Sequence, residues 1–457
     1  MDPLSLETIA MMSCATLLAG DPQAVALRVS KDTRTLRHGD LYVALHGEKY
    51  DGNLFLQEAA SRGAIGALCD GEQRTGLPAH FGILSTPDAY SALTLLASSW
   101  RKRLDLRAIV VTGSSGKTST KDFASTILRS RFRVTSTTGN LNNHIGLPLS
   151  ILEAGSKAGS NDEIAVWEIG MNHRGEIAPL AGLARPEIGI ITGIGTAHIE
   201  HLGSRGEIAR EKGDLLEKLP SNGFAILPAH DDFVSELESR TDATVLKVGF
   251  DSGDVRATDI IAENGGSRFV IHAESGSAEA WLPVPGRHMI GNALLAVAAG
   301  LICEIPIEEC AAALSLVELP SGRLARVQRR GVTFLDDTYN ANPESMIAAI
   351  ETLSSQPATG RRIAVLGRMG ELGIHAAAGY ERVGYAAARN ADTLICVGPE
   401  AASIADSARK EGLNDILQAE DNAAAAKLLS DLVQDGDLVL LKASRSARME
   451  QILQVLT

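Results

Sequence analysis

Short apolar runs alternate with helical stretches along the chain, and many of these runs end at a glycine or a polar residue. Residues 107–112 have the apolar, β-branched character of a buried strand, and residues 121–131 have the composition of a helix. The runs at 163–170 and 187–195 also end in polar or glycine residues, as strands do where a parallel sheet presents its ligand edge. The pattern predicts an α/β fold with a cleft at the carboxyl ends of its central strands.

The turn between the strand at 107–112 and the helix that follows it is rich in glycine and leads to a lysine and hydroxyl residues, VVTGSSGKTST at 110–120. Backbone N–H groups of such a turn, together with the positive end of the helix dipole, can surround phosphate oxygens. Lys117 would reach the outer phosphates of ATP, and Thr118 or Ser119 would reach Mg²⁺. The predicted contacts are Gly113, Ser114, Ser115, Gly116, Lys117, Thr118 and Ser119.

The spacing of this turn departs from the usual phosphate loop. Gly113 and Gly116 enclose two residues, where the common pattern has four. The segment is therefore either a shortened variant of that loop, found in a subset of nucleotide enzymes, or a plain glycine and serine turn before a surface lysine.

The alternation of strands and helices divides the chain into three parts. A small set of strands and a helix precedes residue 105, and the pattern resets near residue 319, after which apolar strands alternate with alanine-rich helices. Because 457 residues exceed what one hydrophobic core spans, we predict three domains. They are a small α/β N-terminal module (1–105), a central P-loop ATPase-type sheet domain (106–318) and a C-terminal Rossmann-like, doubly wound domain (319–457).

Composition and charge narrow the class of protein. The net charge of −13 argues against a nucleic-acid partner, which needs a basic surface. Five scattered cysteines without a CxxC pair are expected to be reduced and buried. The first residues do not resemble a secretory signal, and the apolar run at 289–303 contains Asn292 and is too short to cross a bilayer. We expect a cytoplasmic protein without membrane insertion.

Four further positions could carry chemistry. Glu168 ends a strand that reads as buried, so its carboxylate would need a cation, and Mg²⁺ is the natural one. His198 follows the next strand and either binds a metal or bonds to the sheet edge. Lys212 lies in a helical stretch, where a solvated surface lysine is the simpler interpretation. Asp337 opens an asparagine-rich loop that could bind a sugar hydroxyl or metal-bound water, or that could be a turn before the helix starting at Pro343.

Several segments in the order of the chain resemble the Mur ligase family over nearly its whole length. They include TGSSGKTSTKD (112–122), WEIGMNHRGEI (167–177), TAHIEHLGSRGEIAREKGD (196–214), GRHMIGNALLA (286–296), LPSGR (319–323) and LLKASRSARME (440–450). The segments TGNLNNHIGLPLSIL (138–152) and DDTYNANPESM (336–346) resemble the branch that joins D-alanyl-D-alanine to UDP-N-acetylmuramoyl-tripeptide (UDP-MurNAc-tripeptide). The family's shortened phosphate loop also matches the spacing noted above.

The resemblance implies roles for individual residues. Lys117, Lys212, His198 and Arg323 become catalytic, with Lys212 at the family's carbamylated position, where a CO₂-derived carbamate could position Mg²⁺. The implied metal ligands are Thr118, Glu168, His198 and the Lys212 carbamate. Asn292 becomes an adenine contact, Arg323 a phosphate contact and Asp337 a ribose contact, and Arg323 and Lys442 are expected to act from the third domain or its hinge. The implied substrate contacts are Asp32, Thr33, Arg34, Gly47, Asp51, Asn53, Asn140, Asn142, Asn143, Tyr339, Asn340 and Asn342.

Some residues depart from the family pattern. Thr33 stands where serine is common, Asn53 where histidine is expected and Arg368 where aspartate is frequent, and no role is assigned to Arg368. The base that deprotonates the incoming amine and the third residue of the tripeptide, diaminopimelate or lysine, stay open.

The resemblance implies an ATP-dependent amide ligase. The tripeptide carboxylate would attack the γ-phosphate of ATP to give an acyl phosphate, and the amine of D-alanyl-D-alanine would then form the amide. The alternatives are a related ligase that adds a single amino acid, a folylpolyglutamate synthase-like ligase, and a binding protein that ATP only switches. We expect a monomer.

Overall fold

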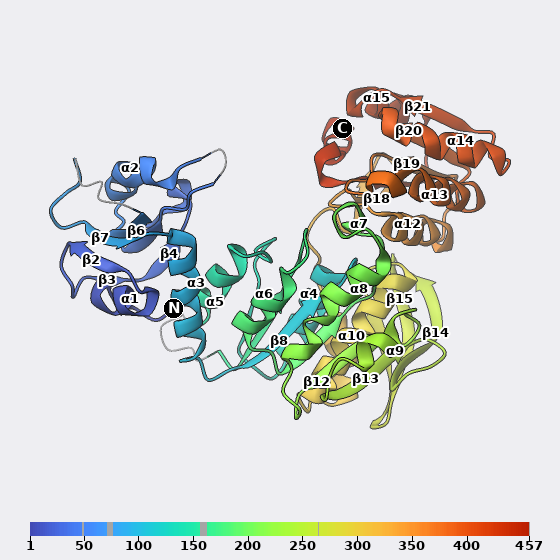
Figure 1. Cartoon of the computed structure of the whole chain (residues 1–457). Coiled ribbons are helices and arrows are strands. Elements are labelled where there is room, and N and C mark those ends of the chain that lie inside the picture. Colours follow the sequence, from blue (N-terminus) through green and yellow to red (C-terminus); the bar gives the residue numbers. More distant parts are fainter. Residues whose placement is uncertain (48–49, 71–75, 156–161, 264, 457) are drawn as a thin grey trace.

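The computed structural model describes residues 1–47, 50–70, 76–155, 162–263 and 265–456. Within these residues the chain forms three larger sheets, each built from one part of the sequence and flanked by helices (Figure 1). The predicted fold class, α/β with three domains, is confirmed.

The N-terminal sheet has the strand order β2-β7-β6-β5-β4, in which β4 to β7 are parallel and β2 is antiparallel. Its strands are β2 (Thr16–Ala19), β4 (Arg28–Ser30), β5 (Asp40–Val43), β6 (Gly66–Asp70) and β7 (Gly82–Thr86). A small two-stranded sheet joins β1 (Leu4–Ser5) to β3 (Val25–Ala26). The helices are α1 (Leu6–Ser13), α2 (Leu56–Ser61) and α3 (Ala89–Arg101), with 3₁₀ turns η1 (Thr33–Thr35) and η2 (Gly52–Phe55).

The central sheet has the order β9-β10-β8-β11-β12-β13-β14-β15-β16, and its strands from β9 to β14 are parallel. An antiparallel extension, β14 to β16, ends the sheet on the side away from β9. The strands are β8 (Arg107–Thr112), β9 (Val134–Ser136), β10 (Ile164–Glu168), β11 (Ile188–Ile191), β12 (Phe224–Pro228), β13 (Thr244–Gly249), β14 (Val255–Glu263), β15 (Gly266–Ala273) and β16 (Gly276–Leu282).

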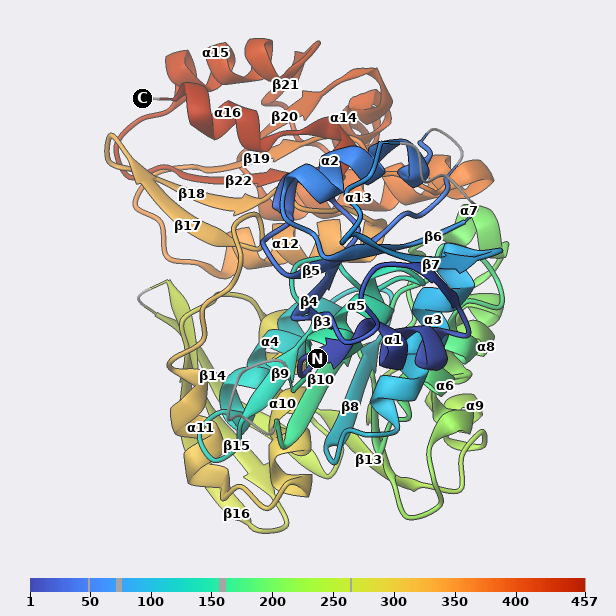
Figure 2. The same cartoon turned by 90° about the vertical axis from the view of Figure 1, so that its left-hand side faces the viewer.

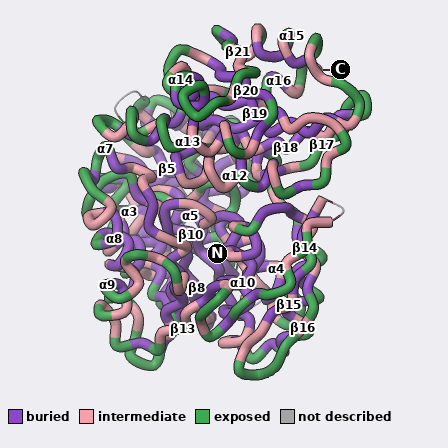
Figure 3. Tube along the Cα trace, turned by 90° about the vertical axis from the view of Figure 1, so that its right-hand side faces the viewer, coloured by how far each residue is buried: buried purple, intermediate pink, exposed green. Residues whose placement is uncertain are grey.

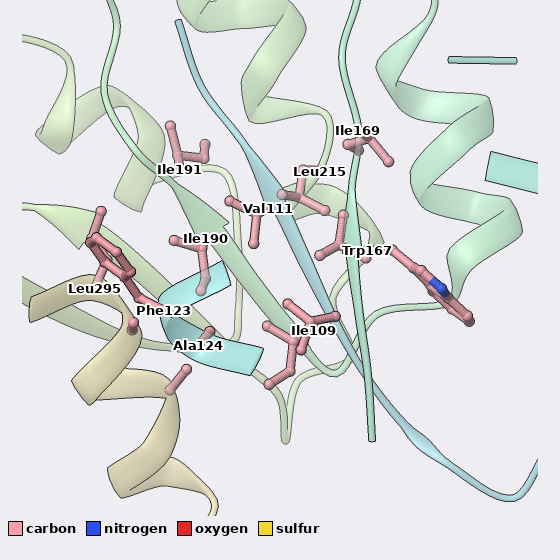
Figure 4. Packing of buried hydrophobic residues seen from close by; sticks show 14 of the residues in the cluster. Ile109, Val111, Phe123, Ala124, Trp167, Ile169, Ile190, Ile191, Leu215 and Leu295 are labelled. Carbon is pink, nitrogen blue, oxygen red and sulfur yellow. The ribbon is translucent and has the colours of Figure 1, made fainter. Parts of the chain in front are cut away.

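Helices cover this sheet and complete its core. They are α4 (Lys117–Leu128), α5 (Gly146–Glu153), α6 (Ile177–Ala184), α7 (Ile199–Leu202), α8 (Arg205–Gly213), α9 (Val234–Glu238), α10 (Arg287–Ile302) and α11 (Ile307–Leu314), with the 3₁₀ turn η3 (Leu216–Lys218). Figure 4 shows Phe123 of α4 and Leu295 of α10 packed beside Ile109 and Ile190 of the central strands. These side chains are buried, so α4 and α10 cover one face of the strands. Leu215 and Leu219 pack on the opposite face at Gly189, as near-continuous apolar runs predict.

The C-terminal sheet has the order β17-β18-β22-β19-β20-β21, with an antiparallel edge strand β17 on an otherwise parallel sheet. Its strands are β17 (Ala325–Arg329), β18 (Val332–Asp337), β19 (Arg362–Leu366), β20 (Thr393–Val397), β21 (Ile416–Ala419) and β22 (Leu438–Lys442). Its helices are α12 (Pro343–Ser355), α13 (Ala376–Asn390), α14 (Ala402–Lys410), α15 (Asn422–Leu432) and α16 (Glu450–Val455), with 3₁₀ turns η4 (Gly373–His375), η5 (Pro399–Ala401) and η6 (Arg445–Ala447). Helices α12 and α13 lie on one face and α15 and α16 on the other, which makes the sheet doubly wound (Figures 1 and 2).

The three parts are arranged around the central sheet. In Figure 1 the N-terminal module stands at the left, joined through α3, and the C-terminal sheet lies above the central domain near α7. Buried residues run through the strands of the central and C-terminal sheets (Figure 3). Among the described helices, none combines the length and apolarity needed to cross a bilayer.

Two local expectations need correction. The helix predicted at 121–131 is α4, Lys117–Leu128: it begins four residues earlier, because Gly116, with φ +83°, lets the phosphate turn lead straight into a helical turn. Cys14 is exposed, whereas the other four cysteines are buried as expected. Cys14 ends α1 in the left-handed region, which places it at the surface.

Candidate active site

The phosphate turn between β8 and α4 requires glycine at two positions, because both have positive φ and both lie close to other side chains. A Cβ atom on Gly113 would lie 1.9 Å from Thr192 Oγ1, and one on Gly116 would lie 2.4 Å from Asn292 Oδ1. Lys117, the first residue of α4, donates from Nζ to the Gly113 carbonyl at 2.8 Å and so lies across the turn. The turn thus has the compact form that an anion-binding loop at a helix N-terminus requires.

A buried carboxylate contacts the end of this turn at Thr118. Glu168 ends β10, is 2% exposed, and accepts hydrogen bonds from Thr118 Oγ1 and Asn142 Nδ2, both at 2.7 Å. Arg323 donates to the same Thr118 hydroxyl at 2.9 Å. Hydroxyl and carboxylate oxygens are the ligand types that Mg²⁺ prefers, so the donor set at Thr118 and Glu168 suits that ion.

His198 lies at the edge of the same cleft but does not contact Glu168. It precedes α7 with φ +64°, and its Nδ1 lies 2.5 Å from Glu371 Oε2 of the C-terminal domain. Burial lowers the pKa of His198, and Glu371 partly opposes that shift. Among the described residues, no cluster of three or more histidine, cysteine or acidic side chains has the geometry of a metal site.

Lys212 is completely buried, which excludes the interpretation as a surface lysine. Its Nζ has no hydrogen-bond partner among the described residues. Burial, followed by the charge of Lys117, lowers the pKa of Lys212 well below its ordinary value. Such an environment favours the neutral, nucleophilic form of the amine.

The helix that carries Lys212 is fixed at its C-terminal end. Glu211 accepts the backbone N–H groups of Gly175, Glu176 and Ile177, at 2.8 to 2.9 Å, where α6 begins. Arg240 pairs with Asp214, 2.7 Å away, just after the helix ends. These contacts orient α8 and thereby the Lys212 side chain.

The C-terminal domain forms the opposite wall of the cleft. Lys442, at the end of β22, donates to Asp337 Oδ2 at 2.5 Å and to the Asn340 carbonyl at 2.9 Å. The guanidinium of Arg323 lies 4.2 Å from the centre of the Tyr339 ring. The loop after β18 therefore presents its polar residues to the phosphate turn.

Most of the predicted nucleotide and metal residues share one cleft of about 750 Å³. Of the predicted residues, it is lined by Ser114, Ser115, Gly116, Lys117, Thr118, Ser119, Asn140, Asn142, Asn143, Glu168, His198, Asn292, Arg323, Asp337, Tyr339, Asn340, Asn342 and Lys442. Lys212 lies behind this lining, close enough to Lys117 for their charges to interact.

The predicted substrate residues of the N-terminal module form a separate group. Asp32 caps η1 and binds the Arg34 guanidinium, which lowers the pKa of Asp32 to about 2. Thr33, between them, is buried. Asp51 caps η2 and accepts from the backbone and side chain of Asn53, at 2.9 and 2.8 Å.

The loop after β5 belongs to the same group. Gly47 donates to the Tyr50 carbonyl at 2.9 Å, and residues 48–49 lie outside the described part of the chain. None of the described residues in this group lines the cleft, so the structure does not bring the two groups together.

Sequence reasoning missed several residues of the cleft. His288 and Glu344 line it, and Glu371 reaches it through His198. Burial lowers the pKa of His288 to about 4. His288 and Glu344 lie inside segments that the resemblance had marked, 286–296 and 336–346, whereas Glu371 carried no spacing signal. Arg368 points elsewhere, with its guanidinium 3.9 Å from Glu400.

Comparison with known proteins agrees with this fold. The model of the Mur ligase middle domain matches residues 111–300, and that of the Mur ligase glutamate ligase domain matches residues 322–445. The chain belongs to the Mur ligase family.

Its relatives include the UDP-N-acetylmuramoyl-tripeptide–D-alanyl-D-alanine ligase of Escherichia coli K12, which is 34% identical over 98% of each chain. The crystal structure of MurF from Acinetobacter baumannii superimposes with a TM-score of 0.90 at 31% identity, covering 100% of this chain and 99% of that one. MurF from Thermotoga maritima in complex with ADP gives a TM-score of 0.82 at 28% identity, covering 94% of this chain and 96% of that one.

Proposed function

We propose that this chain is an ATP-dependent ligase that joins D-alanyl-D-alanine to UDP-MurNAc-tripeptide. The observation that carries the proposal is a phosphate turn facing polar groups of a second domain, in a chain that matches ligases of that name over nearly its full length. The ADP complex of the Thermotoga maritima relative supports ATP as the nucleotide.

Mg²⁺ fits the oxygen donors at the bottom of the cleft. Thr118 and Glu168 would hold it. His198 is a further predicted ligand, and no described contact engages its Nε2 atom. When bound, Mg²⁺ would neutralise charge on the phosphates. A carbamate on Lys212 is the second proposed group, supported by the buried, unpartnered amine.

The reaction begins with activation of a carboxylate, which is a poor acyl donor. The tripeptide carboxylate attacks the γ-phosphorus of ATP, the bond to the β,γ-bridging oxygen breaks, and an acyl phosphate and ADP result. Lys117, Arg323 and the amides of the phosphate turn stabilise the negative charge on the transferring group. The amine of D-alanyl-D-alanine then adds to the acyl carbon, and phosphate leaves as the amide forms.

The remaining predicted contacts divide between the domains. Asn292 and Asp337 would hold the adenine and ribose of ATP from the two walls of the cleft. The Asp32 and Asp51 turns of the N-terminal module would hold the UDP part of the substrate, and Asn142 and Asn340, which line the cleft, would contact its peptide. We propose domain boundaries at 105 and 318, so that each of the three domains has its own role.

We also propose that the chain acts as a monomer in the cytoplasm. A single chain supplies both described walls of the cleft, and its proposed substrates include ATP and a nucleotide sugar.

The test is product formation by the purified chain. Supplied with ATP, Mg²⁺, UDP-MurNAc-tripeptide and D-alanyl-D-alanine, it should give a UDP-MurNAc-pentapeptide detectable by mass spectrometry, together with stoichiometric ADP and phosphate. Tripeptides ending in diaminopimelate and in lysine are compared, and the dipeptide is replaced by single amino acids or the acceptor by a folate in parallel arms. A product formed only with a single amino acid, or only with the folate acceptor, would assign a different ligase. ATP binding without any product would overturn the proposal.

A further inference from the structure

The start of helix α12 is where the C-terminal domain meets the phosphate turn. Asn342 caps α12 through a reciprocal pair of hydrogen bonds with Ser345, at 2.9 and 3.0 Å. Its Nδ2 also donates to Ser115 Oγ at 2.9 Å, a contact between residues 227 positions apart. The position of α12 therefore determines how the C-terminal wall sits on the phosphate turn.

Glu344, in the first turn of α12, makes a second contact with the central domain. Its Oε2 accepts the Thr196 backbone N–H at 3.1 Å and the Thr196 hydroxyl at 2.8 Å. Its Oε1 accepts from Arg382 of α13 at 3.1 Å, on the solvent side. Although burial alone would raise it, these bonds hold the pKa of Glu344 below its ordinary value, so the carboxylate is charged at neutral pH.

The surface that receives Glu344 is part of the phosphate turn's own support. Gly195, next to Thr196, donates its N–H to Ser114 Oγ at 2.8 Å, and Ser114 donates its N–H to the Gly193 carbonyl at 2.9 Å. A Cβ on Gly195 would lie 3.0 Å from Glu344 Oε2. The missing side chain at position 195 thus lets the carboxylate approach the turn after β11.

We propose that Glu344 is a positioning residue, which holds the C-terminal domain in register with the phosphate turn by accepting both donors of Thr196. Asn342, Asp337 and Lys442 then meet the nucleotide at a fixed place. The inference rests on the proposed function only in supposing that the cleft binds ATP.

The requirement is for an acceptor at position 344 rather than for its charge. Glu344→Gln keeps an oxygen for Thr196 and loses the ion pair with Arg382, whereas Glu344→Ala loses every one of these contacts. Arg382→Ala is the matched control, because it removes the solvent-side ion pair and leaves the Thr196 bonds intact. Thr196→Val removes the hydroxyl bond from the other side of the contact.

The first measurement is the distance between the two domains in the full chain, by pulsed electron paramagnetic resonance without substrates. Glu236→Cys in α9 and Lys410→Cys in α14, both at exposed positions, carry the spin labels. The background is Cys14→Ser, which removes the exposed native thiol. Glu344→Ala should lengthen and broaden the distance distribution, while Glu344→Gln and Arg382→Ala should keep that of the unsubstituted background.

The second measurement is steady-state kinetics. Glu344→Ala should raise the KM for ATP about tenfold, since it removes two hydrogen bonds to a charged acceptor, and should leave the KM for the UDP-linked substrate unchanged. Glu344→Gln should restore most of the loss.

Two outcomes overturn the inference: a distance distribution unchanged in Glu344→Ala, or one equally broadened in Arg382→Ala. If Glu344→Ala does not fold, as judged by circular dichroism, Thr196→Val provides the same comparison. Because the distances need no substrate, failure of the proposed ligase activity would leave this test standing.

Discussion

The two candidate sites of this chain are held together in different ways. In the central cleft, residues of different domains bond directly, as Asn342 does with Ser115, Arg323 with Thr118 and Glu371 with His198. In the N-terminal module the predicted substrate residues bond mainly to close neighbours in sequence, as Asp32 does with Arg34. The difference teaches that the predicted nucleotide site is assembled from two domains, whereas the predicted UDP site is a separate surface of the N-terminal module.

The largest expected effect is on ADP formation, from a substitution in the predicted nucleotide site alone. Lys117→Ala should lower kcat for ADP formation by about 10³-fold, because it removes the cation placed to stabilise the transferring phosphoryl group. Calorimetric binding of the UDP-linked substrate should stay within a factor of about two, since its predicted contacts lie in another domain. Loss of both ADP formation and binding of the UDP-linked substrate in a folded variant would contradict the separation of the two sites.

A smaller loss is expected from the buried lysine behind the cleft. Lys212→Ala and Lys212→Arg should each lower kcat by about 10²-fold, because neither side chain can form the proposed carbamate. In buffer containing ¹³C-bicarbonate, the carbamate carbon signal of the unsubstituted protein should be absent from both variants. Full activity in Lys212→Arg, or an unchanged signal, would remove the carbamate from the proposal.

A substitution in the predicted UDP site should have the opposite effect, because it should weaken binding of the UDP-linked substrate and leave ATP binding unchanged. Asp32→Ala should raise the KM for the UDP-linked substrate about tenfold, because Asp32 caps η1 and orients Arg34 there. The KM for ATP should not change. Asp88→Ala is a matched control, since Asp88 caps α3 in the same module without belonging to the predicted site. A rise in the KM for ATP in Asp32→Ala, but not in Asp88→Ala, would show that the two sites are coupled.

The smallest effect concerns the pH dependence of stability at His288. Burial lowers the pKa of this ring from 6.5 to about 4. Above pH 6.5 the ring is neutral in both the folded and the unfolded chain. Between pH 6.5 and 4 the ring binds a proton only in the unfolded chain. The free energy of unfolding should therefore fall by about 1 to 3 kcal/mol across that window, with no further loss below it. Urea titrations of His288→Gln should show a flatter pH profile, and an unchanged profile would contradict a buried neutral ring.

Local pattern was sufficient to predict the strands and the phosphate turn. The apolar runs predicted at 107–112, 163–170 and 187–195 contain the neighbouring parallel strands β8, β10 and β11, whose carboxyl ends meet at one edge. The turn's glycines were visible because their residue type is forced by contacts within the central domain, at Thr192 and Asn292.

Residues whose place depends on domain packing could not be found in this way. Lys212 looked like a surface lysine in a polar helix, and only the tertiary structure buries it. Glu344 and Glu371 gain their partners from another domain, so neither has a local spacing that distinguishes it from a solvated glutamate. That Asp32, Thr33, Arg34, Gly47, Asp51 and Asn53 bind the UDP part stays a prediction, since the structure shows only their bonds within the N-terminal module.

The long sequence separation between Ser115 and Asn342 has a consequence for synthesis on the ribosome. A nascent chain that has completed the central sheet already carries the phosphate turn, but it has yet to receive Asp337, Asn342 and Lys442. Because domains fold as units while translation proceeds, the proposed binding of nucleotide by these residues would have to wait until β22 has emerged. Truncated products of interrupted translation would thus leave the cell's ATP largely unbound.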